Sequence, residues 1–126
     1  MTRFELIKSL LYGILGMVFT IGGFIGLVFP QYAVSGSSSA LKALIHATME
    51  LGAAVTPIGL LLLWSAFHPK EGRKLQYVYL LFFLLFAGVH WYEFLVGNRT
   101  IGSPLVNSVP FLLAIAVSIL DSIMTR

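Results

Sequence analysis

The chain is a succession of long apolar segments separated by short polar pieces. Four such segments cover residues 6–29, 41–67, 75–96 and 104–120. A helix needs about 20 apolar residues to cross the hydrocarbon core of a bilayer, so each segment is long enough. The pattern predicts an all-α, polytopic integral membrane protein. Its four transmembrane helices would form an antiparallel bundle in a single domain, residues 1–126.

Helix-breaking residues set the predicted ends. Pro30 follows the first segment, His68-Pro69 the second and Gly97-Asn98 the third, while Ser103-Pro104 opens the fourth. A proline is favoured in the first turn of a helix and disfavoured further along it, and a serine before it is a favoured cap. We also expect the interior Pro110 to bend the last helix.

Composition supports a membrane location and excludes other classes. Hydrophobic residues make up 58% of the chain and charged residues only 10%, against about 25% charged in soluble domains. The net charge of +3 does not indicate nucleic-acid binding, because the basic residues lie in the short connecting pieces and form no stripe. With no cysteine, any metal would need histidine, carboxylate, amide or hydroxyl ligands.

The distribution of basic residues predicts the topology. Four crossings place both termini and the piece between the second and third helices on one side. That side would carry six of the eight Lys and Arg residues, and the other side only Lys42 and Arg99. The six are Arg3, Lys8, Lys70, Arg73, Lys74 and Arg126. By the positive-inside rule both termini are cytoplasmic. The first apolar segment is too long for a signal peptide, so we expect it to be retained.

Small residues follow one face of the first predicted helix, at alternating spacings of four and three: Ser9, Gly13, Gly16, Thr20 and Gly23. In lipid, helices associate through close packing, which small residues permit. This face is therefore predicted to meet another helix closely. A helix of the same chain is the favoured partner, and a second copy is the alternative.

Polar residues interrupt the apolar segments at one predicted level of the membrane. His46 and Glu50 lie one turn apart near the start of the second helix, and His90 and Glu93 near the end of the third. Antiparallel neighbours bring these ends to one leaflet, where Asn107 would join them. Glu50 lies about 14 Å into its helix, near mid-membrane unless the helix projects from the bilayer. We therefore expect Glu50 to face inward, neutral or paired with His46.

Four interpretations of this polar cluster stay open. The side chains could only tie helices together by hydrogen bonds. Glu50 and His90 could be a catalytic proton-transfer pair acting on a lipid-soluble substrate. His46, Glu50, His90 and Glu93 could hold a metal ion. His46 and His90 could contact a tetrapyrrole or a quinone, with Phe83 and Phe86 against the ring. The cofactor, if any, is unknown.

One stretch carries a family resemblance. MELGAAVTPIGLLLL, Met49 to Leu63, resembles the second helix of DoxX-like small membrane proteins, in which a glutamate precedes a small, Leu-rich segment. The resemblance implies a four-helix bundle that often works beside a larger membrane complex, sometimes an oxidoreductase that uses the quinone pool. The spacing of His46 and Glu50 is also similar to that in sterol-isomerase relatives of the emopamil-binding family, whose His and Glu transfer protons.

The sequence thus predicts a small, non-catalytic membrane subunit, or a protein that contacts lipid or a cofactor. It would assemble with itself or within a larger membrane complex. The alternative is an enzyme that uses His/Glu acid–base or metal-assisted chemistry on a lipid, sterol-like or quinone substrate.

Overall fold

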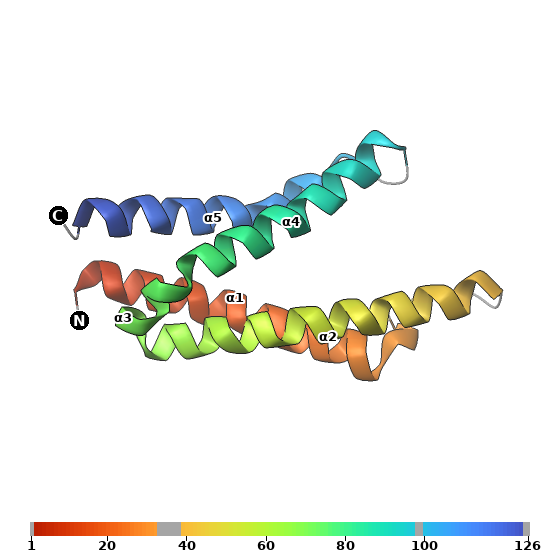
Figure 1. The fold of residues 1–126 in the computed structure, drawn as a ribbon, viewed down its shortest axis with the longest axis horizontal. Helices are drawn as coiled ribbons and strands as arrows, with labels where there is room; N and C mark the ends of the chain where they lie inside the picture. The colour runs from red at the N-terminus through yellow and green to blue at the C-terminus, as the bar shows by residue number, and fades with distance from the viewer. Residues whose placement is uncertain (1, 33–38, 98–99, 125–126) are drawn as a thin grey trace. The chain divides into compact units, whose positions relative to one another are not determined.

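The computed structural model describes residues 2–32, 39–97 and 100–124, which fold into helices without a strand. The elements in Figure 1 are α1 (Arg3–Val28), the 3-10 helix η1 (Pro30–Tyr32), α2 (Ser39–Phe67), α3 (Pro69–Gly72), the 3-10 helix η2 (Arg73–Leu75), α4 (Gln76–Leu95) and α5 (Gly102–Met124). Four helices in this part of the chain are long and apolar enough to cross a membrane. The predicted all-α class is confirmed. Arg99 and Arg126, used for the predicted topology, lie outside the described residues.

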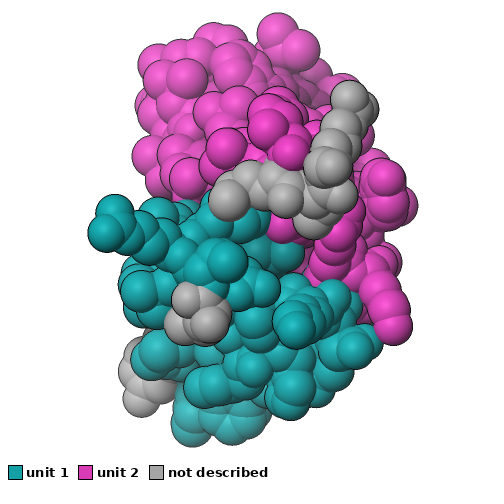
Figure 2. All heavy atoms as spheres, turned by 90° about the vertical axis from the view of Figure 1, so that its left-hand side faces the viewer, with its two compact units in different colours: residues 1–72 teal, residues 73–126 magenta. Residues whose placement is uncertain are grey.

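The chain divides into two compact units, residues 1–72 and 73–126, which Figure 2 colours separately. Unit 1 contains α1, η1, α2 and α3, and unit 2 contains η2, α4 and α5. Each unit is built on two long helices that run antiparallel (Figure 1). The single domain expected for residues 1–126 stays a prediction.

Helix α1 begins earlier than predicted because its first turn is capped. The Thr2 hydroxyl accepts a hydrogen bond from the Glu5 backbone N–H at 3.1 Å, and the Glu5 carboxylate accepts one from the Thr2 N–H at 2.8 Å. This capping box satisfies backbone donors that a helix start leaves unpaired. At the other end the helix stops at Val28, just before Pro30, as the proline predicts.

The connection between the second and third predicted helices is itself helical. Helix α2 ends at Phe67, and α3 and η2 fill the residues up to Leu75. Gly72 is buried, and a Cβ added there would lie 2.6 Å from the Cβ of Ser65. The chain can fold back against α2 here because this position has no side chain. Pro57 lies inside α2 without ending it, as transmembrane helices tolerate.

Helix α5 is longer than predicted at both ends. It begins at Gly102, so Ser103 and Pro104 lie in its first turn, where the missing proline N–H costs nothing. It continues past Leu120 to Met124. Asp121, the first residue beyond the predicted end, follows Ala114 and Val117 at helical spacing and is 9% exposed. The predicted bend at Pro110 stays a prediction.

The small-residue face of α1 packs against α2 within the same chain. A Cβ added at Gly16 would lie 2.7 Å from the backbone nitrogen of Leu63, and one at Gly23 would lie 2.8 Å from that of Thr56. Gly13 faces Ala66 at an ordinary contact distance of 3.8 Å. The small-residue face of α1 was predicted to pack against a helix of the same chain, and in unit 1 that helix is α2.

The small-residue face of α1 also includes two buried hydroxyl groups. The Oγ atom of Ser9 and the Oγ1 atom of Thr20 are buried without a hydrogen-bond partner among the described residues. Gly59 of α2 lies against the backbone of Thr20, which requires both positions to be narrow. The backbones of α1 and α2 approach each other closely, which explains why small residues recur along this face of α1.

The register of the two helices shows that α2 projects beyond α1. Gly26, near the end of α1, lies against Thr48 of α2. The α2 residues before Thr48 therefore extend past the end of α1, as Figure 1 shows. At 1.5 Å per residue the 29 residues of α2 span about 44 Å, against about 30 Å for the hydrocarbon core. The start of α2 lies outside that core when its other end is at the membrane surface.

Candidate functional site at the end of the α4–α5 pair

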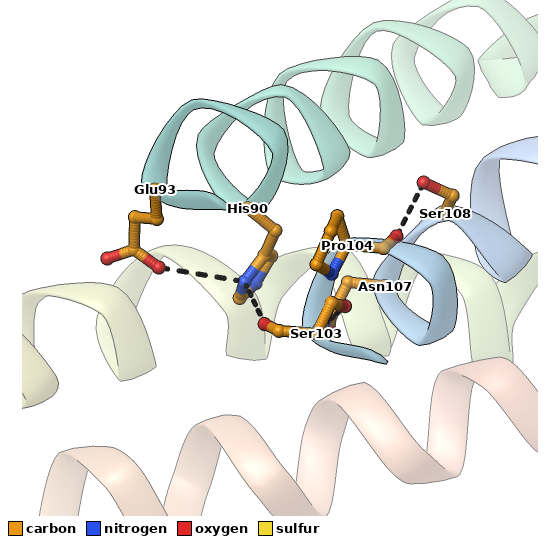
Figure 3. Close-up of polar contacts among 6 residues, drawn as sticks. All are labelled: His90, Glu93, Ser103, Pro104, Asn107 and Ser108. Carbon is orange, nitrogen blue, oxygen red and sulfur yellow. Dashed lines mark hydrogen bonds and ion pairs between the residues drawn. The ribbon is translucent and has the colours of Figure 1, made fainter. Parts of the chain in front are cut away.

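His90 of α4 contacts the first turn of α5. Its Nδ1 atom lies 3.2 Å from the Ser103 hydroxyl, as Figure 3 shows. The carboxylate of Glu93, one turn further along α4, lies 3.9 Å from the same nitrogen. The two side chains are 21% and 31% exposed, so they are largely withdrawn from the surface. This is the predicted polar pair, joined by a serine that the sequence analysis had treated only as a helix cap.

The arrangement differs from a Ser–His–carboxylate relay. In such a relay the hydroxyl and the carboxylate contact opposite nitrogens of the imidazole, so a proton taken on one side is stabilised from the other. Here both groups approach Nδ1, which carries at most one hydrogen and cannot serve both at once. The geometry suits a hydrogen-bonded connection between helices, and Nε2 takes part in neither contact.

Asn107 braces the start of α5. Its Nδ2 atom donates to the backbone carbonyl of Ser103 at 2.8 Å, and the hydroxyl of Ser108 donates to the carbonyl of Pro104 at 2.7 Å (Figure 3). Both bonds link positions one turn apart and hold the turn that presents the Ser103 hydroxyl to His90. Asn107 thus belongs to this site as a support of its serine.

Trp91 makes a second polar connection between α4 and α5. Its indole nitrogen donates to the Ser108 hydroxyl at 3.0 Å. The sequence analysis had not connected these two residues. The contact could have been predicted because an indole N–H in an apolar environment needs an acceptor. Ser108, near the start of the next helix, offers a hydroxyl group for it.

Aromatic rings lead along α4 to His90. Phe82 stacks against Phe86 with ring centroids 6.0 Å apart, and Phe86 meets the edge of His90 at 5.0 Å. Tyr79 and Phe83, earlier on α4, are fully buried. The imidazole is therefore held by an aromatic contact on its own helix and by a hydrogen bond to the next one.

His46 and Glu50 form a separate pair in unit 1. The Nε2 atom of His46 lies 3.1 Å from Oε1 of Glu50, and their side chains are 75% and 69% exposed. The predicted pairing is present. The prediction that Glu50 faces inward is wrong for the α1–α2 pair.

Helix geometry explains the outward orientation of this pair. Positions two residues apart on a helix differ by about 200°, so His46 and Glu50 point nearly opposite to Thr48 and Gly52. Thr48 and Gly52 are on the face that meets α1. Glu50 lies about 26 Å along α2 from Phe67, which would place it near the far boundary of a core about 30 Å thick if Phe67 were at the opposite boundary. The predicted depth of Glu50 stays a prediction.

The four-residue metal set stays a prediction. His46 and Glu50 belong to unit 1, and His90 and Glu93 to unit 2, so each unit by itself supplies two of the four ligands. Among the described residues no group of three or more His, Cys, Asp or Glu is placed to hold a metal ion. The catalytic combination of Glu50 with His90 likewise draws on both units and stays a prediction.

Two charged residues outside the predicted polar cluster are buried. Lys8 is 3% exposed and Asp121 is 9% exposed. Lys8 lies in line with Tyr12, Gly16 and Phe19, which are also buried. Each of these charged residues lies at helical spacing from small or aromatic residues that are buried. This spacing could have identified both as buried from the sequence.

Together these features define the class: an all-α integral membrane protein made of long apolar helices, with a polar site at one end of its α4–α5 pair. Comparisons with protein-family models, with curated proteins and with solved structures find no match. The resemblance to DoxX-like proteins therefore stays a prediction.

Proposed function

We propose that this is a small non-catalytic membrane protein, with both termini cytoplasmic, that contacts lipid or a cofactor within a larger membrane assembly. The exposed His46–Glu50 pair carries the proposal. It lies on the side of α2 turned away from α1, at the level where α1 ends. A polar pair on an outward face at the membrane boundary is available to another polypeptide or to lipid head groups. A buried pair that only ties helices together would not be.

The geometry at His90 supports a role without catalysis. Its Nδ1 atom bonds Ser103, and this bond connects α4 to α5. A side chain that holds two helices together contributes to the stability of a membrane protein without any chemistry on a substrate.

Site-specific photocrosslinking tests the proposal. A benzoylphenylalanine at Met49, between His46 and Glu50 in the sequence and 39% exposed, should form an adduct of defined mass with one polypeptide in native membranes. The matched control is the same residue at Leu60, which is 53% exposed further along α2 and should give lipid adducts. An adduct of twice the chain mass would identify a second copy as the partner. Failure of Met49 to capture any polypeptide would contradict the assembly.

The alternative is acid–base catalysis on a hydrophobic substrate. The 3.1 Å contact between His46 and Glu50 favours it, because an imidazole and a carboxylate at this distance can exchange a proton. Glu50→Gln separates the two functions, since an amide still forms a hydrogen bond with the imidazole but cannot take up or release a proton as a carboxyl group does. Loss of cellular function with the crosslinked assembly intact would support catalysis, and retention of both supports the non-catalytic subunit.

A further inference from the structure

An open groove of about 660 Å³ lies in unit 1, where α1 begins and α2 ends. Figure 1 shows the start of α1 and the short helix α3 at this same end of the unit. The groove is lined by Thr2, Glu5, His68, Pro69, Lys70 and Glu71. It is separate from the His46–Glu50 pair, which lies near the other end of α2. The proposed function assigns it no role.

The lining combines both signs of charge. Lys70 supplies an ammonium group and His68 an imidazole, while Glu5 and Glu71 supply carboxylates. A simple anion would meet the two carboxylates, and a simple cation would meet Lys70. A ligand that carries both charges a few ångströms apart matches the lining better than either.

The orientation of His68 indicates which of its atoms meets a ligand. Nδ1 lies 3.0 Å from the backbone carbonyl of Trp64. A carbonyl only accepts, so Nδ1 carries the hydrogen of this bond and Nε2 is left to interact with a ligand. The ring also stacks on the Trp64 indole, with centroids 4.9 Å apart at 21°, which fixes its plane. With the hydrogen on Nδ1, Nε2 of this imidazole accepts a hydrogen bond from an N–H group.

Two backbone N–H groups at the start of α1 already have partners. The capping box of this helix uses the Glu5 backbone N–H and the Thr2 backbone N–H. The Glu5 carboxylate accepts one of these bonds, but a carboxylate has two oxygens and can accept several. The groove therefore depends on side chains, with Glu5 able to bond a second donor.

Aromatic residues on the last turn of α2 point to a lipid as the ligand. Trp64 is 43% exposed and Phe67 is 80% exposed, directly before the charged turn that lines the groove. A tryptophan at the end of a transmembrane helix lies at the level of the glycerol and head-group region. A molecule with its polar end in the groove would have its apolar part beside these rings.

We infer that the groove binds the head group of a phospholipid with a primary ammonium, of the phosphatidylethanolamine type. Lys70 contacts the phosphate, and Glu71, Glu5 and Nε2 of His68 accept hydrogen bonds from the ammonium. A choline head group has no N–H to donate, and a glycerol head group has no positive charge. The groove therefore distinguishes these three lipids by their head groups alone.

Native mass spectrometry of the full-length chain in detergent tests the inference with dioleoyl lipids that differ only in head group. We expect the ethanolamine lipid to be retained about fivefold more than the choline or glycerol lipid, as one solvent-exposed ion pair of about 1 kcal/mol would give. Lys70→Gln should reduce retention of the ethanolamine lipid, and Glu71→Gln should reduce its advantage over the choline lipid. Both side chains are exposed, so both variants should keep the helicity of the parent in circular dichroism.

Lys42→Gln is the matched control, since it removes one positive charge near the opposite end of α2. It should leave the preference unchanged. Equal retention of the three lipids, or equal effects of Lys70→Gln and Lys42→Gln, would overturn the inference. Soluble phosphoethanolamine should compete poorly, and competition at the concentration of the lipid would show that the ligand is a free metabolite instead.

Discussion

Thr56 of α2 lies so close to Gly23 of α1 that a methyl group on the glycine would come within 2.6 Å of the threonine hydroxyl. The adjacent Gly22 has no atom within 4 Å of the same hypothetical methyl group. Two neighbouring glycines thus occupy opposite environments. One permits close approach of two helices, and the other has open space beside it.

Alanine substitutions at these two glycines should have opposite effects. Gly23→Ala forces α1 and α2 apart and should lower the free energy of unfolding by about 1 to 3 kcal/mol. Gly22→Ala meets no obstacle and should leave stability unchanged or raise it by up to about 1 kcal/mol, because alanine favours the helix. Thermal unfolding of the purified variants in one detergent measures both. Equal melting temperatures for the two variants would contradict the packing described for unit 1.

The hydrogen bond between His90 and Ser103 should appear as an energetic coupling between α4 and α5. In a double-mutant cycle with His90→Ala and Ser103→Ala, we expect the second substitution to cost less once the first is made. The coupling should be about 0.6 to 1.7 kcal/mol, the range of hydrogen bonds between membrane helices. Ser122→Ala combined with His90→Ala is the control, because the Ser122 hydroxyl bonds its own helix at Ile119. A coupling near zero for His90 and Ser103 would show that their contact does not stabilise the pair.

The sequence was most informative about the helices and the face of α1. Apolar segments of sufficient length predict membrane helices because a bilayer leaves the backbone few other ways to satisfy its hydrogen bonds. The glycine spacing on α1 predicted a close partner. The matching small residues of α2, Thr48, Gly52, Thr56 and Gly59, have similar spacing, but the sequence-based prediction did not include them.

Helix ends and side-chain orientation were harder to predict. The start of α1 depends on two reciprocal hydrogen bonds between Thr2 and Glu5. The periodicity of apolar residues does not indicate these bonds. The direction in which the Glu50 side chain points depends on which face of α2 packs against α1. It could be predicted only after that face was known. The contact of His90 with Ser103 required the register of α4 against α5, which helix lengths alone do not determine.

The exposed orientation of Glu50 predicts that its charge contributes little to the stability of the isolated chain. Glu50→Gln should change the free energy of unfolding by less than about 0.5 kcal/mol, because the exposed partner His46 is still able to bond an amide. Glu93→Gln, at a side chain 31% exposed, is the comparison and should cost more. Thermal unfolding in detergent distinguishes them. A larger loss at Glu50 than at Glu93 would indicate that Glu50 is covered in the folded chain.

The proposed topology predicts opposite accessibility for the connections on either side of α4. The chain contains no cysteine, so single-cysteine variants report without background. Lys74→Cys, before α4, should react with a membrane-impermeant maleimide only after cells are opened, whereas Thr100→Cys, after α4, should react in intact cells. The physical reason is the excess of Lys and Arg in the pieces assigned to the cytoplasmic side. Labelling of Lys74→Cys in intact cells, with Thr100→Cys protected, would reverse the orientation of the chain. Labelling of both before lysis would mean that α4 does not cross the membrane.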